Sequence, residues 1–180
     1  MIGCGYMEEL VQVLTEDGKL TGNCIDKLKA HKEGICHGIS AVGLINSDGK
    51  LLLQKRLSTK KLEPSKWDYS SAGHIDLNEN SEDAIIRETY EELGIVIDKK
   101  ELTLIDTFLV KVKLTDEVYI NHFTYLYIVK KDIDINEFKI NKKEISMVKY
   151  VGKDEYNNLI KNDDTVYAMR YCDKVLDYIN

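Results

Sequence analysis

The segment from Gly73 to Ile95 constrains the fold more than any other, because it predicts a loop followed by a short, capped, acidic helix. Ser81 is a good N-cap, and the acidic residues after it stand where the helix dipole favours anions. Gly94 directly follows an apolar residue, as a helix C-cap often does. We therefore expect a helix over about residues 82–93 whose apolar side packs into a core.

Three carboxylates of this helix, Glu88, Glu91 and Glu92, are spaced i, i+3 and i+4 and therefore project from one side. Two unit charges about 6 Å apart at an effective dielectric of about 20 repel by about 2.8 kcal/mol, and a bound divalent cation turns this into attraction. An acidic triplet alone is typical of a solvated helix face. The framing glycines, together with Glu79 and Arg87 at fixed spacing, favour a metal site instead. Ligands that are all oxygen favour Mg²⁺ or Mn²⁺ over zinc.

The whole segment resembles the Nudix box, Gly-x5-Glu-x7-Arg-Glu-U-x-Glu-Glu-x-Gly-U, in which U is an apolar residue. The matching positions are Gly73, Glu79, Arg87, Glu88, Glu91, Glu92, Gly94 and Ile95. Thr89 departs from the pattern at the first U, where its methyl group can pack and its hydroxyl can bond back to the helix. Looser similarity runs from about Glu9 to Val151, and the chain is similar to the Nudix branch related to type I isopentenyl diphosphate isomerases.

This resemblance implies that Glu88, Glu91 and Glu92 bind Mg²⁺ or Mn²⁺, with the backbone carbonyl of Gly73 as a further ligand. It implies the Nudix fold, an α/β or α+β arrangement in which a mixed β-sheet is sandwiched between α-helices. It also implies a pyrophosphatase activity, the metal-dependent hydrolysis of a diphosphate bond. The expected substrate is a small molecule, either nucleoside diphosphate-linked or a related organic diphosphate, and the box does not say which group is attached to the diphosphate.

Other carboxylates are candidates for supporting or catalytic roles. In the family, Glu79 and Arg87 form a salt bridge that orients the helix and the loop. We therefore expect them to support the metal ligands and not to bind the metal themselves. A general base is needed near the metals, and Glu88, Glu117 or Glu144 could serve. Nudix hydrolases often use a Glu from a loop before a late strand, where Glu144 lies. We therefore expect the catalytic residues to be Glu88 and Glu144.

Two basic residues, Lys55 and Arg56, lie at the end of a predicted strand, after the apolar run Leu51–Leu53. Basic side chains beside a carboxylate helix can bind the phosphate oxygens that the metal leaves free. We therefore predict substrate binding by Arg56 and Lys55. The alternative is that they are edge-strand charges that discourage aggregation.

An isomerase is the main competing function. The features that resemble isopentenyl diphosphate isomerases are His31, His37, Pro64, Trp67 and the segment Ser70–His74. Isomerases use a Cys directly before the Gly-His pair to move protons at carbon, but this position is Ala72, which has no proton to give. They also carry a metal-binding Glu-x-Glu where this chain has Thr115–Glu117. The hydrolase is therefore favoured.

Three histidines of that pattern resemble remnants of the isomerases' His-rich metal site. A lone histidine is usually a packed or hydrogen-bonded side chain, so we do not count His31, His37 and His74 as ligands. A third possible function, a non-catalytic Nudix-like binding module, predicts the loss of at least one box carboxylate. All are present, which disfavours it.

The hydrophobic pattern predicts one domain over residues 1–180, with the Nudix box at 73–95. The expected strands cover residues 9–14, 39–45, 51–56, 102–112, 119–129 and 147–151, and the expected helices cover 25–31, 82–93, 154–160 and 164–178. Asp154 is the expected N-cap of the third helix.

Charge and composition exclude several classes of partner. The net charge is −6 and the lysines form only doublets, which argues against duplex nucleic acid. No apolar run approaches the length of about 18 residues that crosses a membrane, and no signal layout is present at the N-terminus. We expect a soluble, cytoplasmic protein with reduced cysteines. A homodimer is compatible with the sequence.

Overall fold

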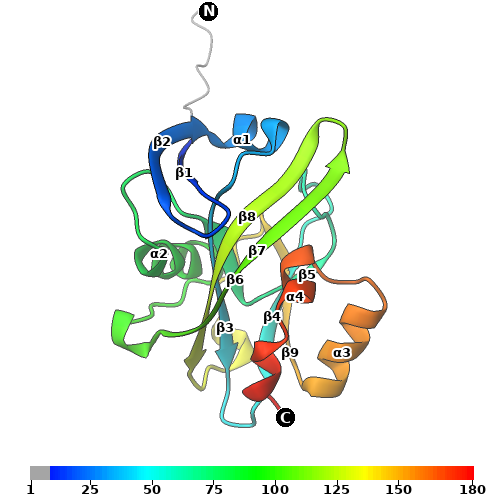
Figure 1. Ribbon diagram of the computed structural model, residues 1–180. Coiled ribbons are helices and arrows are strands. Elements are labelled where there is room, and N and C mark those ends of the chain that lie inside the picture. The colour runs from blue at the N-terminus through cyan, green and yellow to red at the C-terminus, as the bar shows by residue number, and fades with distance from the viewer. Residues whose placement is uncertain (1–8) are drawn as a thin grey trace, which may run out of the picture.

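One strand, β3 (His37–Ile45), is buried along its whole length and organises the sheet of the computed structural model, which describes residues 9–180 (Figure 1). It pairs in parallel with β8 (Val118–Lys130) and antiparallel with β1 (Leu10–Leu14) and β6 (Ser71–His74). A strand covered on both faces needs a nearly continuous apolar run, which the sequence of β3 supplies. The sheet is therefore mixed, as expected.

Two hairpins extend the sheet beyond this strand. β7 (Thr103–Thr115) pairs with β8 along a long antiparallel ribbon, and β2 (Leu20–Asp26) pairs with β1 at the other end. β2 is a strand that the hydrophobic pattern did not predict, because its residues up to Cys24 are exposed and show no alternation.

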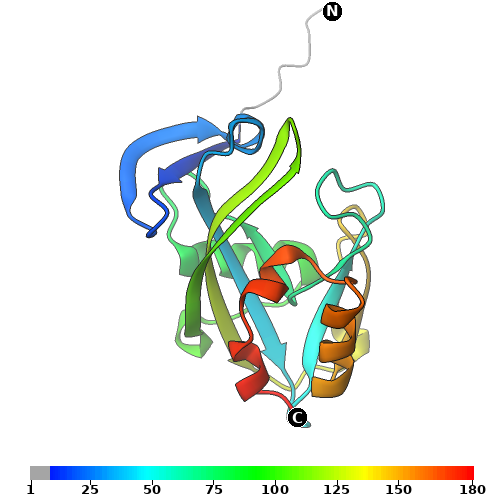
Figure 2. The ribbon, with the colours of Figure 1, turned by 45° about the vertical axis from the view of Figure 1, so that its right-hand side comes forward.

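The other half of the sheet is built on β4 (Leu51–Arg56), which pairs with β9 (Ile145–Val151) and with the short β5 (Trp67–Asp68). β3 and β4 pair only next to their turn, at Ile45 and Leu51. From that turn the two strands diverge, as Figure 2 shows. Side chains from both halves therefore face a space between them.

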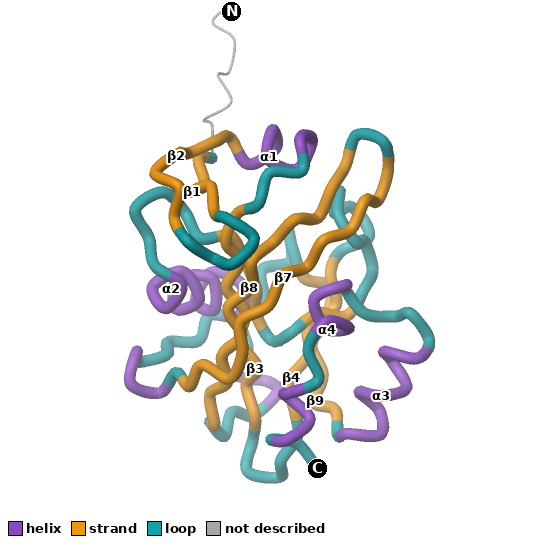
Figure 3. Tube along the Cα trace, viewed as in Figure 1, coloured by secondary structure: helices purple, strands orange, loops and turns teal. Residues whose placement is uncertain are grey.

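Helices cover the sheet on two sides (Figure 3). α2 (Ser81–Leu93) packs into one apolar cluster with β3 and β8, and α3 (Lys153–Lys161) and α4 (Tyr167–Tyr171) pack into a second. α1 (Lys27–Glu33) follows β2. Three short 3₁₀ helices span Lys99–Glu101, Ile135–Glu137 and Lys174–Asp177. The fold is α+β, a mixed sheet between helices.

The predicted helix over residues 164–178 is wrong. The chain forms α4, leaves the helical conformation at Cys172, and resumes as a 3₁₀ helix. Cys172 is buried with its Sγ 3.3 Å from Asp106 Oδ2, and Lys174 Nζ donates to Asp106 Oδ1 at 2.9 Å. These contacts with β7 override the local helical periodicity.

Two predicted N-caps also differ. Asn80, not Ser81, caps α2 by accepting from the N–H groups of residues 82 and 83, while Ser81 Oγ lies 2.7 Å from the hydroxyl of Tyr127. Gly152 precedes α3, and Asp154 lies inside its first turn. Within residues 9–180, no helix is both long enough and apolar enough to span a membrane.

Candidate functional site

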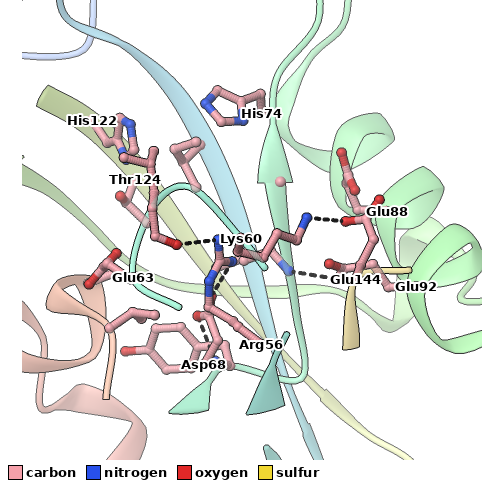
Figure 4. Close-up of a pocket in the computed structure, with 18 of the residues that line it drawn as sticks. Arg56, Lys60, Glu63, Asp68, His74, Glu88, Glu92, His122, Thr124 and Glu144 are labelled. Carbon is pink, nitrogen blue, oxygen red and sulfur yellow. Dashed lines mark hydrogen bonds and ion pairs between the residues drawn. The ribbon is translucent and has the colours of Figure 1, made fainter. Parts of the chain in front are cut away.

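A cavity of about 510 Å³ lies where the two halves of the sheet diverge (Figure 4). Its lining comes from α1, β3, β4, β5, β6, β8, α2 and α4, from the loop at residues 57–66, from the segment before β9, and from residues 9, 69, 76 and 166, which lie outside the helices and strands. Gly73, Glu88, Glu91, Glu92 and Glu144 are all among the lining residues. The structure thus brings the expected metal ligands and the expected catalytic residues to one cavity.

Glu92 is the most deeply buried of these carboxylates, at 5% exposure. Its Oε2 accepts hydrogen bonds from Ser71 Oγ at 2.6 Å, Gln54 Nε2 at 3.1 Å and the backbone N–H of Ala72 at 3.2 Å. Burial raises the pKa of Glu92 to about 8, and the charge of nearby Glu88 adds to this. Within residues 9–180 its Oε1 has no recorded partner and is available to a cation.

Glu88 fills the space that a side chain at position 73 would need. A Cβ added to Gly73 would collide with the Glu88 carboxyl group, so this approach requires glycine. Burial raises the pKa of Glu88, and the charge of Glu91 raises it further. Glu91 is more open, with 54% of its side chain exposed. The three carboxylates thus run from the interior to the mouth of the cavity.

Arg87 holds the loop before α2 against the helix. Its Nε and Nη2 donate to the two oxygens of Glu79 at 3.0 and 2.8 Å, and Nη2 also donates to the carbonyl of His74 at 3.1 Å. Nη1 donates to Glu88 Oε1 at 2.7 Å. These bonds raise the pKa of Arg87, most of all the bond to Glu79. The ion pair expected between Glu79 and Arg87 is present.

Cations also line the cavity, but they are only partly the expected ones. Arg56 lines the cavity and donates through Nη2 to the carbonyl of Leu62 at 3.1 Å. Lys60 donates to Glu144 Oε2 at 2.8 Å, and Lys27 joins the lining from α1. Lys55 is not a lining residue, because neighbouring residues on a strand face opposite sides, and its Nζ lies 5.4 Å from the centre of the Trp67 ring.

Lys27 and Lys60 were missed from the sequence. Lys60 lies in an irregular loop and Lys27 at the start of α1, so no local periodicity of the sequence indicated that these two lysines line the cavity. Successive side chains of a strand point to opposite faces, so Gln54 and Arg56 share one face and Lys55 lies on the other. The sequence could therefore have been used to separate Arg56 from Lys55.

Four histidines form a second cluster beside the same cavity. The ligand atoms of His31, His37, His74 and His122 all lie within 4.8 Å of one another. The sequence interpretation treated the first three as separately packed side chains. The pairing of β3 with β6 and β8 brings them together, since His37 is the register partner of His122. His122 carried no signal at all in the sequence.

The geometry of the cluster suits a metal ion. The Nδ1 atoms of His31 and His37 lie 3.1 and 2.8 Å from backbone carbonyls, which keeps the proton on Nδ1 and leaves the Nε2 lone pair as an acceptor, directed in His31 toward His74 Nε2 at 3.2 Å. Within the described residues, the buried Nε2 atoms of His37 and His122 have no partner. Burial lowers the pKa of all four imidazoles, to about 4 for His37, so they are neutral ligands near pH 7.

The chain also resembles known proteins. The family model for the NUDIX domain matches residues 36–170. Nudix hydrolase 3 of Arabidopsis thaliana is 35% identical over 165 residues, which are 89% of this chain and 21% of that longer protein. An uncharacterized Nudix hydrolase of Listeria monocytogenes is 31% identical, with 85% of each chain covered.

Two further similarities bear on function and fold. Isopentenyl-diphosphate Delta-isomerase 1 of Photorhabdus laumondii is 30% identical over 88% of this chain and 87% of that protein. A solved structure from Deinococcus radiodurans matches with a TM-score of 0.67 at 21% identity, covering 90% of this chain and 98% of the other. At that identity the structural likeness shows the fold alone.

Proposed function

Because this chain belongs to the Nudix family and is a Nudix hydrolase, we propose that it uses Mg²⁺ or Mn²⁺ to hydrolyse a diphosphate bond in a small organic diphosphate or nucleoside diphosphate-linked compound. The observation that carries this proposal is the cavity itself. Its acidic wall, on α2, holds Glu88, Glu91 and Glu92, and Arg56 and Lys60 line the cavity from β4 and from the loop at residues 57–66. The carboxylates of this acidic wall would repel an anionic substrate. Metal ions are therefore needed there to supply positive charge.

The donor set of the acidic wall fits such ions. Glu88, Glu91 and Glu92 would hold them, with the carbonyl of Gly73 as an additional oxygen ligand. The mutual repulsion and burial that raise the pKa of Glu88 and Glu92 are what a cation would offset. When bound, the metal would supply charge stabilisation for the phosphate oxygens and a more acidic water.

Side chains of the cavity bind the substrate and accept the proton in the proposed reaction. Arg56, Lys60 and Lys27 bind the phosphate oxygens and orient the diphosphate. The oxygen of a water molecule forms a bond to one phosphorus as the bond from that phosphorus to the bridging oxygen breaks, and the released phosphate leaves with that oxygen. A carboxylate takes the proton of the water, and Glu144 and Glu88 are the proposed bases. Glu79 and Arg87 act only by holding the loop and Glu88 in place.

A screen of diphosphate compounds tests this function. The purified protein is incubated with nucleoside di- and triphosphates, nucleotide sugars and organic diphosphates, and phosphate-containing products are measured. We expect turnover with Mg²⁺ or Mn²⁺ and none in EDTA. Full activity in excess chelator would show that the proposed chemistry is wrong.

The histidine cluster and the Photorhabdus relative favour a second candidate function, an isomerase-like activity. The four imidazoles would hold a transition metal, since their donor set is all nitrogen. Against isomerisation stands Ala72, which cannot donate or accept a proton at carbon. We therefore expect hydrolysis and no interconversion of the two isomers.

Proton NMR in deuterated buffer with Mg²⁺ separates the two functions. Isopentenyl and dimethylallyl diphosphates are each incubated with the protein. We expect no deuterium at the methyl or methylene positions, while either compound can release phosphate slowly. Deuterium incorporation would establish the isomerase instead.

A further inference from the structure

The cavity has a second end, away from the carboxylates of α2, whose walls hold Glu63, Asp68 and Thr124 (Figure 4). Arg56 and Lys60 lie between this end and α2. The proposed hydrolysis uses none of the three side chains at the second end. Two of them are carboxyl groups. Asp68 is buried and pairs with Arg56, its Oδ2 lying 3.4 Å from Nη1, whereas Glu63 forms no ion pair within residues 9–180. A carboxylate held away from water without such a partner is costly.

Glu63 is held in place by an unfavourable backbone. Its φ is 47° and that of Ser65 is 61°, on either side of Pro64. Residues other than glycine rarely adopt this left-handed conformation, and they do so where the surrounding structure fixes them, often at functional sites. Glu63 Oε1 accepts from the backbone N–H of Tyr167 at 2.6 Å, which ties the loop to the start of α4. The side chain is therefore fixed at the cavity wall.

Anchoring the loop does not by itself require an acid. A glutamine carbonyl would accept the same hydrogen bond without the cost of a buried charge. Burial raises the pKa of Glu63 to about 7, and the charge of Asp68 adds to this rise. The recorded hydrogen bond occupies only Oε1. Within residues 9–180, Oε2 has no recorded partner, and Glu63 lines the cavity.

Other polar atoms on the same walls also lack partners. Within the described chain, Thr124 Oγ1 and Arg56 Nε are buried without a hydrogen bond, although buried polar groups are normally satisfied. Thr124 is only 1% exposed. Among the lining residues within 9–180, Tyr69 is the only Phe, Tyr or Trp, and it is 0% exposed, so it offers no face on which a nucleobase could stack.

We propose that Glu63 selects the group attached to the diphosphate, and that this group is small, non-aromatic and hydroxyl-bearing, such as a pentose or another polyol. This inference rests on the proposed hydrolase function. One hydroxyl of the group donates to Glu63, and another pairs with Thr124. An alkyl or isoprenoid group would leave Glu63 Oε2 and Thr124 Oγ1 without partners, and a site built for hydrogen bonds rejects such analogues strongly.

A matched pair of substrates tests the selection. A pentose 5-diphosphate and n-pentyl diphosphate have the same number of carbon atoms and differ in their hydroxyl groups and ring. We expect the wild-type protein with Mg²⁺ to prefer the pentose compound by at least about tenfold in kcat/KM. Glu63→Gln keeps an acceptor for the N–H of Tyr167. It should raise KM for the pentose compound by at least about tenfold and leave pentyl diphosphate unchanged.

The matched control is Glu155→Gln, which removes an exposed carboxylate on α3 paired with Lys149 and should keep the wild-type preference. Equal turnover of both compounds by the wild-type protein would overturn the inference and leave the hydrolase function standing, as would a preference for nucleoside triphosphates. Absence of turnover for every diphosphate would instead remove the hydrolase function. The wild-type comparison decides the matter even where Glu63→Gln does not fold.

Discussion

At the scale of a single residue, Glu92 is the proposed metal ligand that the fold holds most firmly. Ser71, Gln54 and the backbone of Ala72 hold one oxygen in place, so the side chain is positioned before any ligand binds. The raised pKa of Glu92 reflects the cost of a buried negative charge that has no cation beside it. A metal ion would compensate the charge without moving the side chain, which is the arrangement expected of a preorganised site.

Replacing this carboxylate should therefore separate catalysis from folding. We expect Glu92→Gln to lower kcat by at least about 10²-fold while the circular dichroism spectrum stays unchanged, because charge is lost and shape is kept. Glu79→Gln should act mainly on thermal stability or on the Mg²⁺ concentration needed for activity, since Glu79 contacts Arg87. Unchanged turnover by Glu92→Gln would remove this residue from the site.

Glu63 should make stability depend on pH. Its pKa in the folded protein is about 7, against an ordinary value of 4.5, so the folded state favours the protonated form. Its stabilising contribution is therefore complete below about pH 4.5 and is lost as the pH rises through about 7. Asp68 strengthens this effect, and Arg56 and Arg170 oppose it. In urea unfolding between about pH 5 and 8, wild-type stability should fall relative to that of Glu63→Gln. Parallel curves would contradict this.

At the scale of elements, α2 could be predicted because its signals are local. The expected helix over residues 82–93 agrees with Ser81–Leu93, Gly94 caps it at a φ of 70°, and the hydroxyl of Thr89 donates to the carbonyl of Ile85 as expected. Elements defined by tertiary contacts were not predictable in the same way. The break at Cys172 depends on Asp106, a residue far away in the sequence.

The glycines at the two ends of the acidic segment should respond differently to alanine. Gly94→Ala forces a side chain into a left-handed cap and against Lys139, so it should lower the free energy of unfolding by about 1 kcal/mol or more and keep kcat. Gly73→Ala displaces Glu88 and should lower kcat by more than about tenfold. Thermal unfolding and steady-state rates measured on both variants distinguish the two roles. The same response from both would show that neither glycine is specific to the site.

The histidine cluster illustrates why part of the site escaped the sequence. His37 and His122 are 85 positions apart and meet only because β3 and β8 pair in parallel in one register. Metal sites with local spacing leave a motif, but sites assembled across a sheet do not. Glu88, Glu91 and Glu92 lie within five consecutive positions, which is why they were found.

At the scale of the whole molecule, the expected α+β fold is confirmed by the sheet, the helices on both of its sides, the match to the NUDIX family model and the likeness to the solved structure from Deinococcus radiodurans. The hydrophobic pattern predicted most strands because their cores are apolar runs. It could not predict that β3 and β4 diverge, since this depends on the pairing of β4 with β9 and of β3 with β8.

Two kinds of metal should stabilise the whole protein through different residues. A ligand that binds only the folded state raises Tm by mass action. We expect Zn²⁺ to raise Tm through the histidines and Mg²⁺ to raise it through the carboxylates of α2. In differential scanning calorimetry, His122→Gln should reduce the zinc effect and keep the magnesium effect, and Glu92→Gln should do the reverse. Loss of both effects in either variant would argue against two separate sites.

Because β3 and β4 diverge, the two groups of side chains at the two ends of the cavity stand on different elements and can be altered independently. The carboxylates stand on α2, whereas Glu63 stands on the loop at residues 57–66 that leaves β4. Side-chain substitutions at residues 61–66 are expected to alter which compound enters while Lys60 and the carboxylates of α2 stay in place, because surface loops tolerate change better than packed helices do. Exchanging these residues between related chains is therefore a direct route to exchanging their substrates.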